Sequence, residues 1–268
     1  MKYTLFVILL PVLLFITVPL VACDYIVKAD SLFELRDRDF NEEKLLADSA
    51  RINRAIALYK TAINDSICAE YKKDAIWKLL QALYFKGNFT THNKSEKKEI
   101  FTEGIEIGEK YKDEFPQSVE VHCWLGIIWG YWGEVHSALS AARKGVPKKV
   151  KYYAKKTIEL DDKYLDAGGY RMLGRLHFMV PKIPLLLSWP SKEKSQQFLE
   201  QAYQIAPDNL LNKLYLAEVL FSRDYKDRAF DLLHEIVDMN CIKHGLVVDA
   251  WIKKQADEFL KKNFSESE

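Results

Sequence analysis

A pattern of small residues beside large ones recurs along this chain and constrains its fold more than any other feature. The copies are centred on Leu80, Leu125, Leu173 and Leu216, and each has a bulky residue four positions further on. In the last three copies a glycine or alanine directly follows the leucine. A small residue lets two antiparallel helices approach closely, while bulky neighbours fill the seam between them. The pattern therefore predicts helix pairs stacked side by side.

The spacing within each copy resembles the tetratricopeptide repeat (TPR). After Leu216, for example, Ala229, Leu233 and Ile236 occupy the positions expected for the second helix of a repeat. Successive copies lie further apart than the roughly 34 residues of an ideal TPR, which indicates degenerate repeats with insertions. The fold class expected is all-α: a TPR-like α-solenoid of antiparallel helix pairs, preceded by an N-terminal signal peptide, with about ten to twelve helices.

The first 22 residues have a short cationic start followed by a long apolar run, which is typical of a secretory signal peptide. The run is also long enough to span a bilayer, so an uncleaved anchor is the alternative. It ends in Leu20-Val21-Ala22-Cys23, which resembles the lipobox of bacterial lipoproteins. That resemblance implies a lipidated Cys23 and a folded part that is tethered to a membrane through its acyl chains.

The expected organisation is a lipoprotein signal peptide over residues 1–22, a tether with a first helix over 23–48, and a TPR-like repeat domain over 49–264. A helix start is expected at Ser31, where Ser31-Leu32-Phe33-Glu34 has the pattern of a capping box. Lys and Arg number 39 against 38 Asp and Glu, and this near-neutral balance gives no reason to expect nucleic acid as a partner.

The remaining cysteines, Cys68, Cys123 and Cys241, are odd in number and have no C-x-x-C spacing. We expect buried thiols, neither a disulfide framework nor a zinc site. The six histidines form no metal-binding motif, and the sequence has no phosphate loop or nucleophile elbow. The expectation is a protein that is not an enzyme and has no cofactor or metal.

The stretch from Val121 to Val135 is unusually aromatic. Its Trp129 occupies a repeat position, while Trp124 and Trp132 continue a second apolar face, so this helix is either buried on two sides or lines a cavity. The apolar, proline-flanked loop over residues 180–190, together with Trp129 and Trp132, is where we expect the mouth of a channel if one exists.

The segment Gly169–Leu233, with its Gly-Arg-Leu helix, proline-containing loop, Ala-Pro-Asp-Asn turn and Leu-Ala-Glu helix, resembles the T component (TatT family) of bacterial TRAP transporters. The eukaryotic family of microtubule-dynamics regulators, also built of degenerate TPR units, shares the Leu-Gly-Arg helix and is the second candidate. A lipobox would be out of place in that family.

The TRAP resemblance implies a lipid-anchored protein on the periplasmic side of a bacterial membrane, often self-associating. Its partners would be the solute-binding protein and the permease of an uptake system, and its ligand a small organic acid or an apolar molecule in a channel. The competing function is a general TPR scaffold of the cell envelope that docks protein partners.

The inner face of the first helix in each pair supplies the candidate site. On that face Arg171 and Arg175 lie four residues apart, so two guanidinium groups could bind one carboxylate. The alternative is that they pair internally with Asp166 or Glu218. The candidate ligand-binding residues are Arg171, Arg175, Trp129, Trp132, Phe178 and Glu218.

Overall fold

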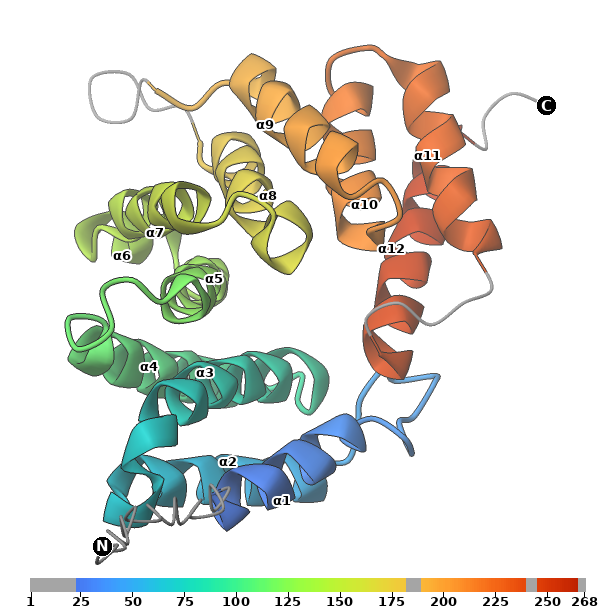
Figure 1. The fold of residues 1–268 in the computed structure, drawn as a ribbon. Coiled ribbons are helices and arrows are strands. Elements are labelled where there is room, and N and C mark those ends of the chain that lie inside the picture. Colours follow the sequence, from blue (N-terminus) through green and yellow to red (C-terminus); the bar gives the residue numbers. More distant parts are fainter. Residues whose placement is uncertain (1–22, 182–188, 240–244, 265–268) are drawn as a thin grey trace, which may run out of the picture.

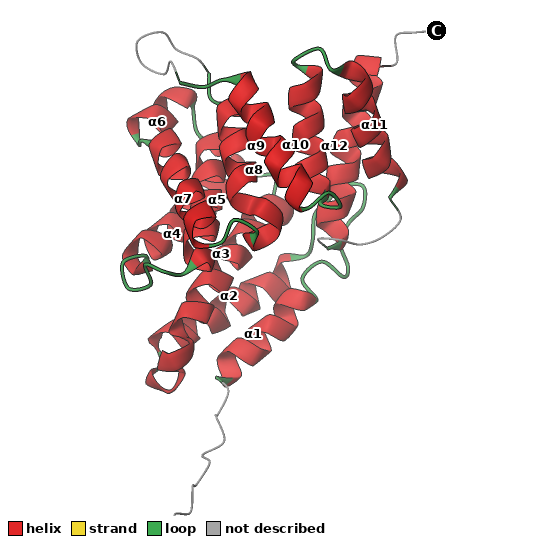
Figure 2. Ribbon diagram, turned by 45° about the horizontal axis from the view of Figure 1, so that its top comes forward, coloured by secondary structure: helices red, strands yellow, loops and turns green. Residues whose placement is uncertain are grey.

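The computed structural model describes residues 23–181, 189–239 and 245–264, and within them the regular secondary structure consists of helices joined by loops and turns (Figures 1 and 2). The one pairing of extended backbone in this part is an isolated bridge between Asn41 and Leu46. The helices are α1 (Asp24–Glu34), α2 (Ser49–Asn64), η1 (Ser66–Tyr71), α3 (Lys72–Phe89), α4 (Lys94–Tyr111), α5 (Val119–Val135), α6 (Ala138–Arg143), α7 (Val146–Leu160), α8 (Tyr164–Met179), α9 (Lys192–Ile205), α10 (Leu210–Phe221), α11 (Lys226–Asp238) and α12 (Leu246–Phe264).

The helices stack as successive pairs along a curved array, which Figure 1 shows as an arc running from blue to red. The pairs are α1 with α2, α3 with α4, α5 with α7, α8 with α9, and α10 with α11, with α12 packed against α11. The expected all-α solenoid of helix pairs is confirmed. The expected helix start at Ser31 is wrong, because α1 already begins at Asp24 and the Ser31 hydroxyl donates to the Val27 carbonyl one turn earlier.

Helices approach each other closely at the small residues, both within a pair and between neighbouring pairs. A methyl group added at Gly174 would lie 2.4 Å from Cγ of Leu199 on α9, and one at Gly126 would lie 2.8 Å from Cβ of Tyr153 on α7. Gly108 on α4 meets a side chain of α5 in the same way, at 2.5 Å. Each distance is too short for a real side chain, so these seams exist only with glycine in place.

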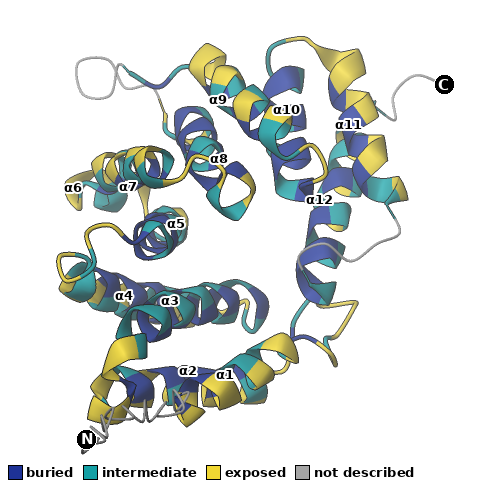
Figure 3. Cartoon of the chain, in the orientation of Figure 1, coloured by how far each residue is buried: buried dark blue, intermediate teal, exposed yellow. Residues whose placement is uncertain are grey.

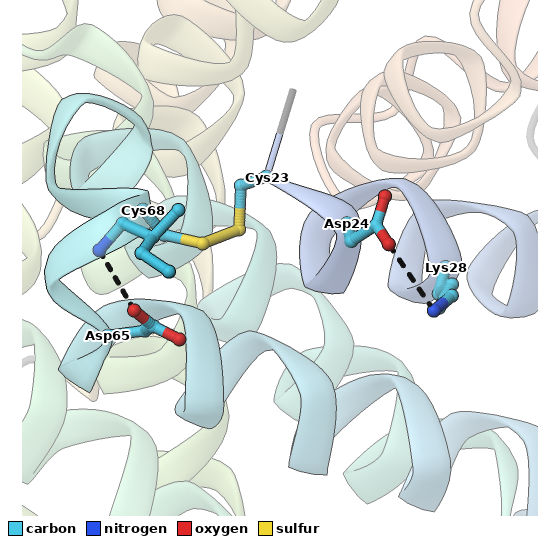
Figure 4. Close-up of a disulfide and its surroundings, with 6 residues drawn as sticks. Cys23, Asp24, Lys28, Asp65 and Cys68 are labelled. Carbon is cyan, nitrogen blue, oxygen red and sulfur yellow. Dashed lines mark hydrogen bonds and ion pairs between the residues drawn. A yellow bond between two sulfur atoms is a disulfide. The ribbon is translucent and has the colours of Figure 1, made fainter. Parts of the chain in front are cut away.

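A disulfide fastens the start of α1 to η1 (Figure 4). The sulfur atoms of Cys23 and Cys68 are bonded, both residues are buried, and the bridge spans a sequence separation of 45. Two expectations are thereby corrected. Cys68 is not a simple buried thiol, and Cys23 is not available for a lipid, because one sulfur cannot hold both a disulfide and a thioether. Cys123 is a free, buried thiol as expected, and Cys241 lies outside the described residues.

The two ends of the array touch each other. The backbone N–H of Val247, at the start of α12, donates to Oδ2 of the buried Asp37 just after α1, at 3.2 Å. Trp251 of α12 lies edge-on to Phe89 at the end of α3, with ring centroids 6.3 Å apart. Figure 1 shows the start of α12 beside the loop that follows α1. The solenoid is therefore closed into a ring around its concave side.

None of the described helices is long and apolar enough to cross a membrane. Residues 1–22 lie outside the described part of the chain, so the expected signal peptide is not tested there.

The packing at glycine gives a matched pair of predictions. Gly174→Ala should lower the free energy of unfolding by about 1–3 kcal/mol, because the new methyl group overlaps Leu199. Gly130→Ala, on α5, should raise it by about 0.5–1 kcal/mol, because a methyl group there meets nothing within 4 Å and alanine favours the helix. Urea unfolding of both variants measures the difference, and equal effects would contradict the packing described here.

Removal of the disulfide should also destabilise the fold. Replacing both cysteines by serine should lower the free energy of unfolding by about 4 kcal/mol, the chain-entropy value for a loop of this length. Urea unfolding of the oxidised protein and the double variant gives this number, and peptide mass spectrometry without reductant identifies the link. A Cys68 thiol that alkylates freely, beside a Cys23 peptide carrying acyl mass, would instead restore the lipidation prediction.

Candidate binding cavity

A cavity of about 460 Å³ lies on the concave side of the array. Most of its lining comes from α3, α5, α8 and α10, the first helices of their pairs, and α6 and α7 supply further residues. In Figure 3 these inner helices are mostly dark blue and teal, while the outer helices α9 and α11 carry more exposed residues. The residues that give the cavity its chemical character are Tyr84, Trp124, Tyr131, Glu134, Arg175 and Tyr215.

Aromatic rings from two helices meet in the wall of the cavity. Tyr84 of α3 lies 5.5 Å from Trp124 and 5.2 Å from Tyr131, both of α5, measured between ring centroids. Burial raises the pKa of Tyr84 to about 12 and raises the pKa of Tyr131 well above its ordinary value. Both phenols are therefore neutral near pH 7, and both carry a hydroxyl that can donate and accept.

Arg175 projects from α8 into the same region but is already partnered. Its Nη1 donates to Oε2 of Glu218 on α10, and its guanidinium lies over the Tyr215 ring, 4.3 Å from the centroid. Burial alone would lower the pKa of Arg175, but Tyr215, Glu218 and Glu134 outweigh it and raise the pKa. A guanidinium held this way is balanced by an internal carboxylate before any ligand arrives.

Glu134, one turn after Tyr131, is in the opposite situation. Glu134 is an exposed residue of the cavity lining, although enough protein lies around its carboxyl group to desolvate it. Within the described residues Glu134 forms no ion pair, because no side-chain nitrogen of a lysine, arginine or histidine lies within 4.0 Å of its carboxylate oxygens. Burial raises the pKa of this carboxyl group, and the more distant charges of Arg175 and Lys97 only partly offset that effect.

Arg171 stabilises a strained turn at the rim of the cavity. Leu165, Asp166 and Ala167 have φ of +52°, +54° and +63°, a left-handed conformation that costs roughly 1–3 kcal/mol for each such residue. Nη2 of Arg171 donates to the Leu165 carbonyl at 3.0 Å, and Nη1 donates to the Asp166 carbonyl at 3.1 Å and to Oδ1 of Asn212 at 2.8 Å. The guanidinium therefore donates to two successive carbonyls of the left-handed segment and links that segment to α10 through Asn212.

The structure separates the candidate residues named from the sequence. Arg175 lines the cavity and Glu218 pairs with it, which is the internal pairing considered as the alternative. Arg171 also reaches the lining, but its donors are occupied by the turn. Phe178 lies beside the Arg175 guanidinium, 5.9 Å away, outside the lining.

Trp129 and Trp132 face away from the cavity, toward α4. Nε1 of Trp129 donates to Glu109 and Nε1 of Trp132 donates to Oγ1 of Thr102, both at 3.0 Å. The expectation that these tryptophans form the mouth is therefore wrong, because their N–H groups need partners in the seam with α4. Of the apolar loop, residues 180 and 181 line the cavity, whereas residues 182–188 lie outside the described part of the chain.

Sequence reasoning missed most of the cavity wall. Ile127, Tyr131 and Glu134 recur at helical spacing and form a third face of α5, next to Trp124 of the second apolar face, and this periodicity was the available signal. Tyr215, which directly precedes a consensus leucine, carried no signal of its own. No group of three or more potential metal ligands occurs within the described residues.

The architecture and its concave cavity define a TPR-like α-solenoid. A solved structure agrees with this class: a thermophilic TPR protein from Thermus thermophilus superposes with a TM-score of 0.60 at 14% identity, covering 88% of this chain and 97% of that one. The chain belongs to the family described as regulator of microtubule dynamics protein 1-3, whose model matches residues 41–264. No curated protein matches the chain.

The family match overturns the resemblance to the TRAP transporter T component. The Gly-Arg-Leu helix and the small-beside-large spacing are shared by degenerate TPR units in general, so they could not separate the two families. The second candidate named from the sequence was the correct one.

The role of Arg171 at the turn can be tested directly. Arg171→Met should lower the free energy of unfolding by about 3 kcal/mol, because it leaves the partly buried Leu165 carbonyl and the Asn212 amide oxygen without the guanidinium donor and removes one of the two donors to the Asp166 carbonyl. Arg171→Lys keeps the charge but loses the planar fork, and should lower it by about 1–2 kcal/mol. If urea unfolding places both variants within about 0.5 kcal/mol of the wild type, the turn does not depend on Arg171.

Proposed function

We propose that this protein is an interaction scaffold that binds a short segment of a partner protein in its concave cavity. The observation that carries the proposal is the cavity itself, which lies on the face that helical repeat arrays use for binding. Its wall combines aromatic rings with a few polar groups, the composition of surfaces that anchor protein contacts.

The volume of the cavity limits how much of the partner protein can enter it. At about 460 Å³ it falls within the range of about 300–1,000 Å³ typical of small-molecule pockets, too small for a whole helix. The partner therefore inserts a few side chains or a chain end. The closure between Asp37 and Val247 agrees with this, because a closed ring admits a short segment more readily than a long one laid in an open groove.

The proposal also includes a compartment. Disulfides persist in oxidising environments and are rare in the cytosol, and the chain begins with an apolar run of the secretory type. We place the folded part, and hence its partner, in an exported compartment. Self-association, the lack of enzymatic activity and the lack of a nucleic-acid partner stay predictions.

A cavity-filling variant tests the function. Gly130→Phe adds a ring where the backbone faces open space in the cavity, and Ala57→Phe adds the same bulk at an exposed position of α2 outside the lining. After crosslinking in cells, the partners captured by the wild type and by Ala57→Phe should be recovered about tenfold less with Gly130→Phe.

Two outcomes would overturn this assignment. An identical set of partners on all three proteins would place the interaction elsewhere on the surface. A small molecule that copurifies with the wild type in native mass spectrometry, and is absent from Gly130→Phe, would replace the protein segment by a small ligand.

A further inference from the structure

We propose that the segment bound in the cavity carries a basic side chain, lysine or arginine, whose cationic group pairs with Glu134 beside the rings of Tyr84 and Tyr131. This inference rests on the proposed function and names the chemistry of the partner. It reverses the charge expected from the sequence, where two arginines on one face suggested a carboxylate ligand.

The charges that line the cavity lead to this assignment. Arg175 is neutralised by Glu218, and three acceptors occupy the donors of Arg171, so neither guanidinium is poised for an incoming anion. Glu134 and Asp166 both line the cavity without an ion pair within the described residues. Oδ2 of Asp166 accepts from Nδ2 of Asn209 at 2.9 Å, which leaves Glu134 as the less satisfied of the two carboxylates. A carboxylate in a largely apolar cavity is costly to leave unpaired, and a cationic partner supplies what the chain does not.

The rings around Glu134 favour the same sign of charge. Tyr131 precedes Glu134 by one turn of α5, and Tyr84 stands opposite with its ring inclined by 64° to that of Tyr131 and by 50° to that of Trp124. Ring faces attract cations and repel carboxylates. Gly130, on the same helix, leaves open space at the wall, so a long aliphatic stem has room to pass.

Other positive groups near the cavity do not fill this role. Lys97 influences Glu134 electrostatically but sits on α4, outside the lining, and forms no ion pair with it. Arg36 lines the far wall, where its guanidinium lies over the rings of Phe33 and Phe85 and donates to the Phe33 carbonyl. Both leave the carboxylate of Glu134 facing the cavity.

Three probes with one apolar chain and different charges test the proposal: hexylammonium, hexanol and hexanoate. Calorimetric titration of the purified protein should show hexylammonium binding about tenfold more tightly than hexanol, with hexanoate the weakest. Equal affinities, tighter binding of hexanoate, or no binding of any probe up to its solubility limit would overturn the assignment.

Charge variants locate the effect. Glu134→Gln should reduce the preference for hexylammonium over hexanol to about twofold or less. Glu99→Gln removes the same charge from an exposed position of α4 outside the cavity and should leave the preference unchanged. Glu218→Gln frees Arg175 and should shift the preference toward hexanoate. If Glu134→Gln still binds hexylammonium about tenfold more tightly than hexanol, the inference is wrong.

The two proposals fail separately. If Gly130→Phe abolishes partner capture but hexylammonium shows no preference, the scaffold function holds and the basic side chain is wrong. If the preference is found but partner capture is unaffected by Gly130→Phe, the cavity binds cations and the protein partner docks elsewhere.

Discussion

The close approach of helices at glycine is the constraint on which the rest of this structure depends. At Gly174 and Gly126 one helix of a pair lies directly against a bulky side chain of its partner helix, and at Gly108 the same kind of contact joins one pair to the next. The angle and spacing of the array are therefore set by contacts that tolerate no added methyl group. These contacts place α3, α5, α8 and α10 along the inner side of the arc. The cavity follows from that placement, because these four helices supply most of its lining, and α6 and α7 supply further residues.

The fold was largely predictable because it arises from local patterns. Helical periodicity and the small residue after each consensus leucine lie within a few positions of one another, and they fix the helix pairs whatever the distant sequence does. The exceptions also have local causes. Ser31 has a capping pattern, yet the helix begins earlier because the Cys23 carbonyl already accepts from the N–H groups of Ile26 and Val27.

The site was much less predictable, since it depends on pairings between distant residues. Arg175 and Glu218 are 43 positions apart and Cys23 and Cys68 are 45 apart, and nothing in either spacing indicates a contact. The sequence offered internal pairing of the arginines only as an alternative to ligand binding. Because Arg175 is paired with Glu218, the groups left to contact a ligand are Glu134 and the tyrosines. None of these residues belongs to a sequence motif.

The contact between Asp37 and the start of α12 also limits how this fold can evolve. An open solenoid can gain or lose a repeat and simply become longer or shorter, because each unit touches only its neighbours. Here an inserted pair would push the first and last helices apart and expose the buried Asp37 carboxylate and the seam between Trp251 and Phe89. The contact between the two ends of the array therefore fixes the number of helix pairs that the ring can contain.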